Sequence, residues 1–202
     1  MKIDSKACQE EFCSLLRSTG REGVEGLIED ITTQGFFEAP ASAGHHLNVE
    51  GGLAQHSLNS CKAALAVWEG MKTVEPTLAN EVTRESIIIA TLLHDLCKID
   101  IYRRSVKKRK NALGQWEDSE GYKVTYRNFP MGHGEKSVIL ALCSGIELSD
   151  AEMLAIRWHM GAYEGKDSWP GYDAAIRKYP NVLWTHTVDM YASKVMEERN
   201  AE

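Results

Sequence analysis

The sequence lacks any long apolar run. Its 202 residues contain no stretch approaching the ~20 consecutive apolar residues that a membrane-spanning helix requires, so we expect no membrane partner. The first residues, MKIDSKACQEEF, carry acidic side chains and lack the apolar segment of a secretory signal peptide. Together these absences predict a cytoplasmic protein.

Paired cysteines are also missing. The five cysteines are odd in number, scattered along the chain and never arranged as C-x-x-C. Such a pattern argues against a disulfide framework and against a thiolate zinc site. We interpret all of them as small buried apolar side chains: Cys8, Cys13, Cys61, Cys97 and Cys143.

An excess of positive charge is absent as well. The chain has 23 lysines and arginines against 29 acidic residues, a net charge of -6, which does not favour nonspecific binding to long duplex nucleic acid. One basic cluster departs from this trend: Arg103, Arg104, Lys107, Lys108, Arg109 and Lys110. The sequence leaves two interpretations of this cluster open, a solvated face and an electropositive flap over a phosphorylated substrate.

Most of the chain has the apolar periodicity of α-helices. Its length fits one domain with a sizeable core, residues 1–202, with N-terminal helices and a loop at 1–44 and the core at 45–199. The spacing predicts helices at 5–18, 22–34, 52–71, 83–98, 134–144, 149–161, 172–179 and 181–199. Thr83 is the expected N-cap of the fourth helix, and Ser149 with Glu152 predicts a capping box.

Residues 100–130 break the helical pattern. The segments IYRRSVKKRK and GYKVTYRNF flank NALGQWEDSE, which is rich in turn-forming residues, and this arrangement predicts a β-hairpin. The expected fold class is therefore all-α, a helical bundle with a small β-hairpin insertion.

Histidines and acids in apolar helices carry the chemical signal. The candidate metal ligands are His56 in GGLAQHS, His94 and Asp95 in HDLCK, His133 in GHGEKS, His159 in RWHM and Asp189 in HTVDMYAS. A single histidine on an apolar helix face is more often a hydrogen-bonded core residue. The two aspartates are harder to explain in that way, because an unpaired buried carboxylate is costly. Neutral imidazoles and carboxylates bind divalent metals well.

The order of these residues, H…HD…H…H…D, resembles the HD-domain superfamily of metal-dependent phosphohydrolases. The resemblance spans about residues 45–195, and GGLAQHS is similar to the HD domain attached to bacterial 3′-to-5′ exoribonucleases. The sequence shows no nucleic-acid-binding barrel domain ahead of this region, so we do not expect an exonuclease. The superfamily's usual HD-x-G-K becomes HDLCK, with Cys97 in place of glycine.

The resemblance implies an HD-type bundle that binds two divalent metals (Fe, Mn, Ni, Co or Mg). By position, the first metal would be held by His56, His94, Asp95 and Asp189, and the second by Asp95, His133 and His159. Two such metals about 3.5–4 Å apart activate water and stabilise the attacking and leaving oxygens of phosphoryl transfer. Asp95, as the bridge, would then be a catalytic residue.

Three further residues are candidates for substrate binding. Lys98 lies one helical turn beyond His94, and the resemblance implies that it contacts a substrate phosphate and assists catalysis. The alternative is a surface lysine that stabilises a helix C-terminus. Lys136 and His46 are weaker candidates for the same role. His186, three residues before Asp189, is either a hydrogen-bonding partner of the site or a packing residue.

The expected activity is hydrolysis of a phosphomonoester or phosphodiester, in a nucleotide or a short oligonucleotide. Two alternatives stay open: a di-iron oxygenase with the same six ligands, and a non-catalytic nucleotide-binding sensor domain. Oxygen consumption with bound iron would separate the first from a hydrolase, and tight binding without turnover would favour the second. The sequence does not specify the substrate, the metal or the oligomeric state.

Overall fold

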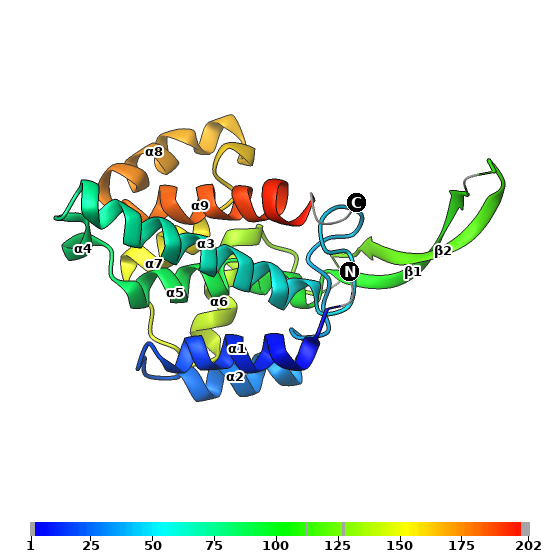
Figure 1. Ribbon diagram of the computed structural model, residues 1–202, viewed down its shortest axis with the longest axis horizontal. Helices are drawn as coiled ribbons and strands as arrows, with labels where there is room; N and C mark the ends of the chain where they lie inside the picture. The colour runs from blue at the N-terminus through cyan, green and yellow to red at the C-terminus, as the bar shows by residue number, and fades with distance from the viewer. Residues whose placement is uncertain (1–2, 112, 127, 199–202) are drawn as a thin grey trace.

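The computed structural model describes residues 3–111, 113–126 and 128–198, which form a helical bundle with a projecting two-stranded arm (Figure 1). Its α-helices are α1 (Ser5–Arg17), α2 (Val24–Thr33), α3 (Gly52–Val74), α4 (Leu78–Glu81), α5 (Arg84–Leu93), α6 (His133–Cys143), α7 (Asp150–Arg157), α8 (Trp169–Lys178) and α9 (Asn181–Tyr191). Shorter turns are the 3₁₀ segments η1 (Leu96–Ile99), η2 (Gly161–Tyr163) and η3 (Lys166–Ser168), and the π-helix η4 (Ala192–Glu197). Among these helices none is both long enough and apolar enough to cross a membrane. The predicted all-α class with a small hairpin is confirmed.

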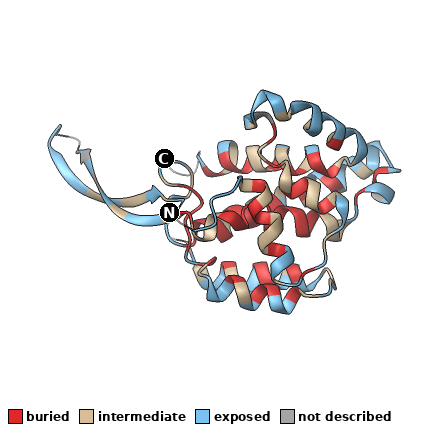
Figure 2. Ribbon diagram, turned by 180° about the vertical axis from the view of Figure 1, so that it is seen from behind, coloured by how far each residue is buried: buried red, intermediate tan, exposed pale blue. Residues whose placement is uncertain are grey.

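Helix α5 is the centre of the bundle. Every residue from Ile87 to Leu93 is buried, and the helix packs against α3, α7, α9 and α1 (Figure 2). A helix that is apolar on all sides has this position because no face of it gains from water. Its predicted N-cap is confirmed, since the Thr83 hydroxyl accepts a hydrogen bond from the Ser86 N–H at 3.1 Å.

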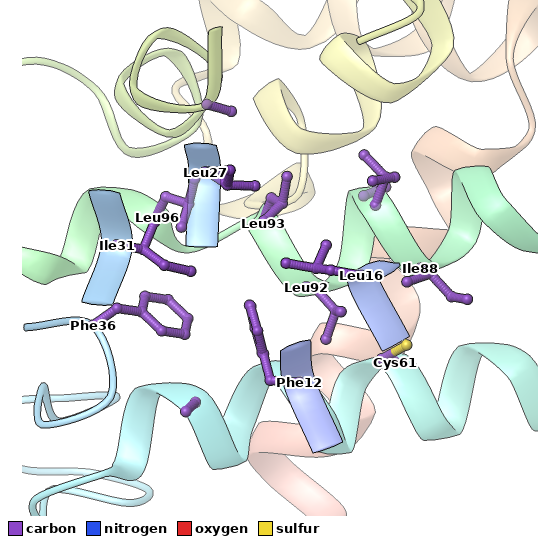
Figure 3. Packing of buried hydrophobic residues seen from close by; sticks show 14 of the residues in the cluster. Phe12, Leu16, Leu27, Ile31, Phe36, Cys61, Ile88, Leu92, Leu93 and Leu96 are labelled. Carbon is purple, nitrogen blue, oxygen red and sulfur yellow. The ribbon is translucent and has the colours of Figure 1, made fainter. Parts of the chain in front are cut away.

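The apolar core joins the first two helices to α3, α5 and η1. Figure 3 shows Phe12 and Phe36 packed between these elements, with ring centroids 5.0 Å apart. One face of α2 is buried in this core: Val24, Leu27, Ile28 and Ile31. Each large side chain removed from water in this way stabilises the fold by roughly 1.5–3 kcal/mol.

The structure corrects several predicted details and confirms others. The helix expected at 83–98 ends at Leu93, and the one expected at 149–161 ends at Arg157, because a histidine side chain bonds a terminal carbonyl in each case. Four cysteines are buried as expected, but Cys143 is exposed; all five are free thiols. The short helix α4 was not predicted. The capping box of Ser149 and Glu152 is confirmed.

The predicted hairpin consists of β1 (Tyr102–Lys110) and β2 (Trp116–Val124). The strands are antiparallel, in a register that runs from Tyr102 opposite Val124 to Lys110 opposite Trp116. The pair projects from one end of the bundle, near the point where the first and last described segments lie (Figure 1). The register places the basic strand against an acidic one, and Lys108 pairs with Asp118 at 2.7 Å.

Candidate metal centre

Asp95 lies in the middle of a buried histidine cluster. It follows α5, is 2% exposed, and presents its two oxygens to different neighbours. Oδ2 lies 3.3 Å from Nε2 of His94 and 3.5 Å from Nε2 of His56. Oδ1 lies 3.5 Å from Nε2 of His159. The arrangement brings α3, α5 and α7 together at one carboxylate.

Asp189 adds a second carboxylate from α9. Its Oδ1 is 3.0 Å from Nε2 of His56 and 3.7 Å from Nε2 of His94, and its side chain is 17% exposed. The four residues predicted to hold the first metal therefore lie together: His56, His94, Asp95 and Asp189.

His133 reaches the same carboxylate from the start of α6. Ligand atoms of Asp95, Cys97 and His133 all lie within 4.8 Å of one another. The structure thus gathers the other five predicted ligands around Asp95, and the six residues come from five separate helical regions. Their role as metal ligands remains a prediction.

Two helix ends fix the orientation of the imidazoles. Nδ1 of His94 donates to the Thr91 carbonyl at 2.8 Å, and Nδ1 of His159 donates to the Ile156 carbonyl at 2.7 Å. Each bond satisfies one of the carbonyls that a helix C-terminus leaves without a partner. Nε2 of each ring faces Asp95, and because Nδ1 carries the proton in these bonds, Nε2 is the nitrogen that can bind a metal. Such bonds orient histidine ligands in metal sites.

Two glycines in the motifs allow close backbone approaches. A Cβ on Gly52 would lie 2.1 Å from the carbonyl oxygen of Leu47, and a Cβ on Gly134 would lie 2.0 Å from that of Arg157. The first glycine therefore lets the loop before α3 pack against the start of that helix. The second lets α6 begin against the end of α7, which brings His133 toward the cluster.

Glu197 is a buried neighbour of the cluster that the sequence analysis missed. Its side chain is 1% exposed, and its carboxylate accepts from Nδ1 of His56 at 3.0 Å and from the Asn59 amide at 2.9 Å. In a continuous α-helix, Glu197 would lie roughly 80° around the axis from Asp189, eight residues earlier. The π-helix η4 changes that rotation and turns Glu197 toward His56.

The protonation of each group in the cluster depends on the charges of its neighbours. Burial lowers the pKa of His56, but hydrogen bonds to Asp189 and Glu197 outweigh this effect and raise the pKa to about 8. Burial also opposes protonation of His94, yet the charge of Asp95 and its bond to Asp189 raise its pKa to about 10. Burial raises the pKa of Asp95, but Lys98 and His94 bring it well below its usual value. Without metal, protons on the histidines thus balance the carboxylates, and a bound cation would displace them.

The donor atoms fit a divalent metal. Asp95 Oδ1 and His159 Nε2 are buried and have no hydrogen-bond partner within the part of the chain that the structure describes. Leaving such atoms unsatisfied is costly, and a cation between them would satisfy both. Imidazole nitrogens and carboxylate oxygens also match the preferences of divalent first-row metals. This donor set does not identify the metal.

A cavity of about 230 Å³ opens beside the cluster. Asp95, Asp189 and His159 form part of its wall, so the centre is accessible to a small ligand. The wall also contains residues that the sequence analysis did not single out, Met190, Ser193 and Lys194 among them.

Lys98 lies in this wall with its side chain 12% exposed. Its ammonium is 2.6 Å from Asp95 Oδ2; burial lowers the pKa of Lys98, but Asp95 raises it above its usual value. The alternative of an exposed surface lysine is therefore wrong. Lys136 has a different position, since its ammonium is buried against Asp100 and is not part of the cavity wall. Its predicted contact with substrate remains a prediction.

His46 also forms part of the cavity wall. Its ring nitrogens are buried without a hydrogen bond among the described residues, and the nearest carboxylate oxygen, on Glu197, is 3.9 Å away. Burial, then the neighbouring charges of His56 and Lys98, lower the pKa of His46 to about 4. His186 donates from Nδ1 to the His159 carbonyl at 2.7 Å, so it supports the backbone of a predicted ligand.

Comparison with curated proteins finds a partial match. The chain is 41% identical over 61 residues to the dihydroneopterin 2′,3′-cyclic phosphate phosphodiesterase of Methanocaldococcus jannaschii. The matched segment is 30% of this chain and spans 23% of that protein, less than a quarter of its length. No protein-family model matches, and no solved structure gives a significant match. The likeness is local, so membership of the HD superfamily remains a prediction.

Proposed function

We propose that this protein is an HD-type metal-dependent phosphohydrolase that cleaves a phosphodiester or phosphomonoester in a nucleotide or short oligonucleotide. The observation that carries the proposal is the convergence of four histidines and a second aspartate around buried Asp95. The activity named for the partial relative, a cyclic phosphate phosphodiesterase, agrees with this chemistry and favours a phosphodiester.

The proposed ligands fall into two groups that share Asp95. Oδ2 of Asp95 faces His56 and His94, whereas Oδ1 faces His159, so each oxygen is available to a different metal. His56, His94 and Asp189 would complete the first group, and His133 and His159 the second. Divalent metals bound there would supply a nucleophilic hydroxide at neutral pH and Lewis acidity for the phosphoryl oxygens.

The protein's own side chains bind and orient the phosphate. Lys98 presents a partly exposed cation in the cavity wall and neutralises charge on the phosphoryl oxygens. His46, kept neutral by burial, offers a hydrogen bond from the same wall. The cavity is smaller than the ~300–1,000 Å³ of typical small-molecule sites, so it fits the phosphate end of a substrate and leaves the remainder outside.

The experiment is a metal analysis followed by an activity screen. The purified protein, supplied in turn with Mn²⁺, Co²⁺, Fe²⁺, Ni²⁺ or Mg²⁺, is assayed with bis-p-nitrophenyl phosphate, p-nitrophenyl phosphate and 2′,3′-cyclic nucleotides. We expect metal-dependent hydrolysis that Asp95→Ala abolishes and Asp173→Ala retains, because Asp173 lies in an exposed ion pair with Arg177. Oxygen consumption without phosphate release, or nucleotide binding without turnover, would overturn the proposal.

A further inference from the structure

Cys97 has different surroundings from the other buried cysteines. Cys8, Cys13 and Cys61 lie in the main apolar core, whereas Cys97 belongs to neither of the apolar clusters formed by the described residues. It lies in η1 and is 1% exposed. Its N–H donates to the Ser137 hydroxyl at 3.1 Å, which ties η1 to α6. From the sequence, Cys97 was interpreted as a buried apolar side chain, but packing in an apolar cluster does not account for its position.

The sulfur of Cys97 faces the histidine cluster. Sγ lies 3.5 Å from Nδ1 of His133. Ligand atoms of Cys97, His133 and Asp95 lie within 4.8 Å of one another. Two ligands of one tetrahedral metal, with bonds of about 2.3 Å to sulfur and about 2.0 Å to nitrogen, lie roughly 3.5 Å apart. The observed separation therefore suits two ligands of a single ion.

Two further buried donor atoms on the same side of Asp95 are available to bind a metal. Asp95 and His159 are at least 98% buried, and Oδ1 of the first and Nε2 of the second have no hydrogen-bond partner in the described ranges. These two atoms lie 3.5 Å apart, on the side of Asp95 assigned above to the second metal.

We propose that Cys97 is a thiolate ligand of the second metal, together with Asp95, His133 and His159. The proposal rests on the metal centre of the proposed function and extends its ligand set beyond the six residues of the resemblance. When the metal binds, sulfur forms a bond to it and the thiol proton passes to solvent. A soft sulfur ligand favours Zn²⁺ and Co²⁺ over the harder Mg²⁺ and Mn²⁺. Cys97 thus determines metal choice at this position.

The experiment uses cobalt as a spectroscopic probe. The full chain is stripped of metal and titrated with Co²⁺ while the near-ultraviolet absorption is recorded, since a cobalt–thiolate bond gives a charge-transfer band that histidine and carboxylate ligands do not give. We expect the band to saturate with Co²⁺ and to be lost in Cys97→Ser. It should be retained in Cys61→Ser, a matched control that is equally buried but lies in the apolar core.

Zinc affinity provides a second measurement. Removing a direct ligand should weaken Zn²⁺ binding in Cys97→Ser by at least the ~10–100-fold seen when outer partners of a metal site are removed. Binding of Mg²⁺ should change much less, because magnesium gains little from sulfur. Equal losses for both ions would overturn the role of Cys97 in metal choice.

The outcomes separate this proposal from the proposed function. Cobalt binding without a charge-transfer band means that Cys97 only hydrogen-bonds to His133, which overturns the thiolate ligand and leaves the metal centre. A Cys97-dependent band without phosphohydrolase activity supports the ligand and overturns the function. Should Cys97→Ser fail to fold, a parent band that survives serine substitution at each of the other four cysteines still assigns the thiolate to Cys97. A parent protein without the band overturns the proposal directly.

Discussion

Lys98 places a fixed cation beside the central carboxylate of the cluster. Its ammonium lies 2.6 Å from Asp95 Oδ2 and within the cavity wall, so it reaches both the centre and an incoming phosphate. We predict that Lys98→Ala lowers kcat/KM about 10–100-fold, because a hydrogen bond to a charged group contributes roughly 1.5–3 kcal/mol. Bound metal should stay near normal. Steady-state kinetics and metal analysis of the same preparation check this.

Lys136→Ala tests the second lysine that the sequence analysis proposed for substrate binding. Its ammonium is buried against Asp100 and away from the cavity wall, so its loss should lower the free energy of unfolding and leave KM unchanged. Loss of metal in Lys98→Ala would instead show that Lys98 acts by holding Asp95. A raised KM in Lys136→Ala would restore the substrate-binding role that the sequence suggested.

Glu197 orients His56 from the side away from the centre. We predict that Glu197→Gln weakens binding of Mn²⁺ or Co²⁺ about 10–100-fold, because partners of this kind fix the orientation of histidine ligands and raise their basicity. Titration of the metal-free variant measures the effect. Glu198→Gln is the control, since Glu198 pairs with Lys194 at the surface. Equal affinities in the two variants would show that Glu197 has no such role.

Residues within motifs were predictable, whereas partners outside them were not. Asp95 and His133 stand in recognisable segments, so their order along the chain indicated a common site. Glu197 had no such signal, because an acid near the end of a helix is usually exposed and its orientation depends on the π-helix. Cys97 was interpreted as an apolar side chain because the number and spacing of the cysteines do not indicate its contact with His133.

The C-terminal ends of α5 and α7 position two of the histidines in the proposed metal centre. The apolar pattern continues past His94 and past His159, so the sequence predicted helices that run on through both residues. In the structure α5 and α7 end earlier, and each histidine bonds the carbonyl three residues before it. Fold class, the hairpin and both predicted caps followed from local patterns. The ends depended on side chains that compete with the backbone for its hydrogen bonds, which periodicity does not reveal.

The contact between α6 and α7 positions His133. We predict that Gly134→Ala lowers the free energy of unfolding by roughly 1–3 kcal/mol, the usual cost of forcing extra atoms into a packed site. The new Cβ would lie 2.0 Å from the Arg157 carbonyl oxygen, so α6 must move away and take His133 with it. Chemical denaturation and metal titration both report this change. Gly165→Ala is the control, because no atom lies within 4 Å of its added Cβ; equal losses in the two variants would contradict the packing argument.

The hairpin arm projects beyond the bundle, and its first strand carries the whole basic cluster (Figure 1). We predict that replacing residues 107–110 by serine raises KM for an oligonucleotide substrate at low salt, because the variant loses electrostatic attraction. The effect should shrink at high salt, where exposed charges are screened, and bound metal should not change. Kinetics at two ionic strengths check this. An unchanged KM at low salt would show that the cluster is a solvated face, with Lys108 neutralised by Asp118.

On the scale of the whole molecule, the proposed metal centre joins segments that are far apart in the chain. His56 lies in α3, His133 in α6 and Asp189 in α9, and all three lie in the cluster around His94 and Asp95, which follow α5. Without a metal, these contacts depend on protons shared between histidines and carboxylates. A metal bound to the folded state alone would hold the same segments together more strongly, so metal affinity and fold stability should be linked.

Removal of metal should therefore lower the melting temperature. A ligand present at 100 times its Kd stabilises the folded state by about 2.7 kcal/mol. For a chain of this size each kcal/mol corresponds to about 2–4 °C, so we predict that excess Mn²⁺ or Co²⁺ raises Tm by roughly 5–10 °C over the chelated protein. Scanning calorimetry measures the shift. Asp95→Ala should show almost none, because it removes the carboxylate shared by both proposed groups. A shift of equal size in Asp95→Ala would place the stabilising metal elsewhere in the protein.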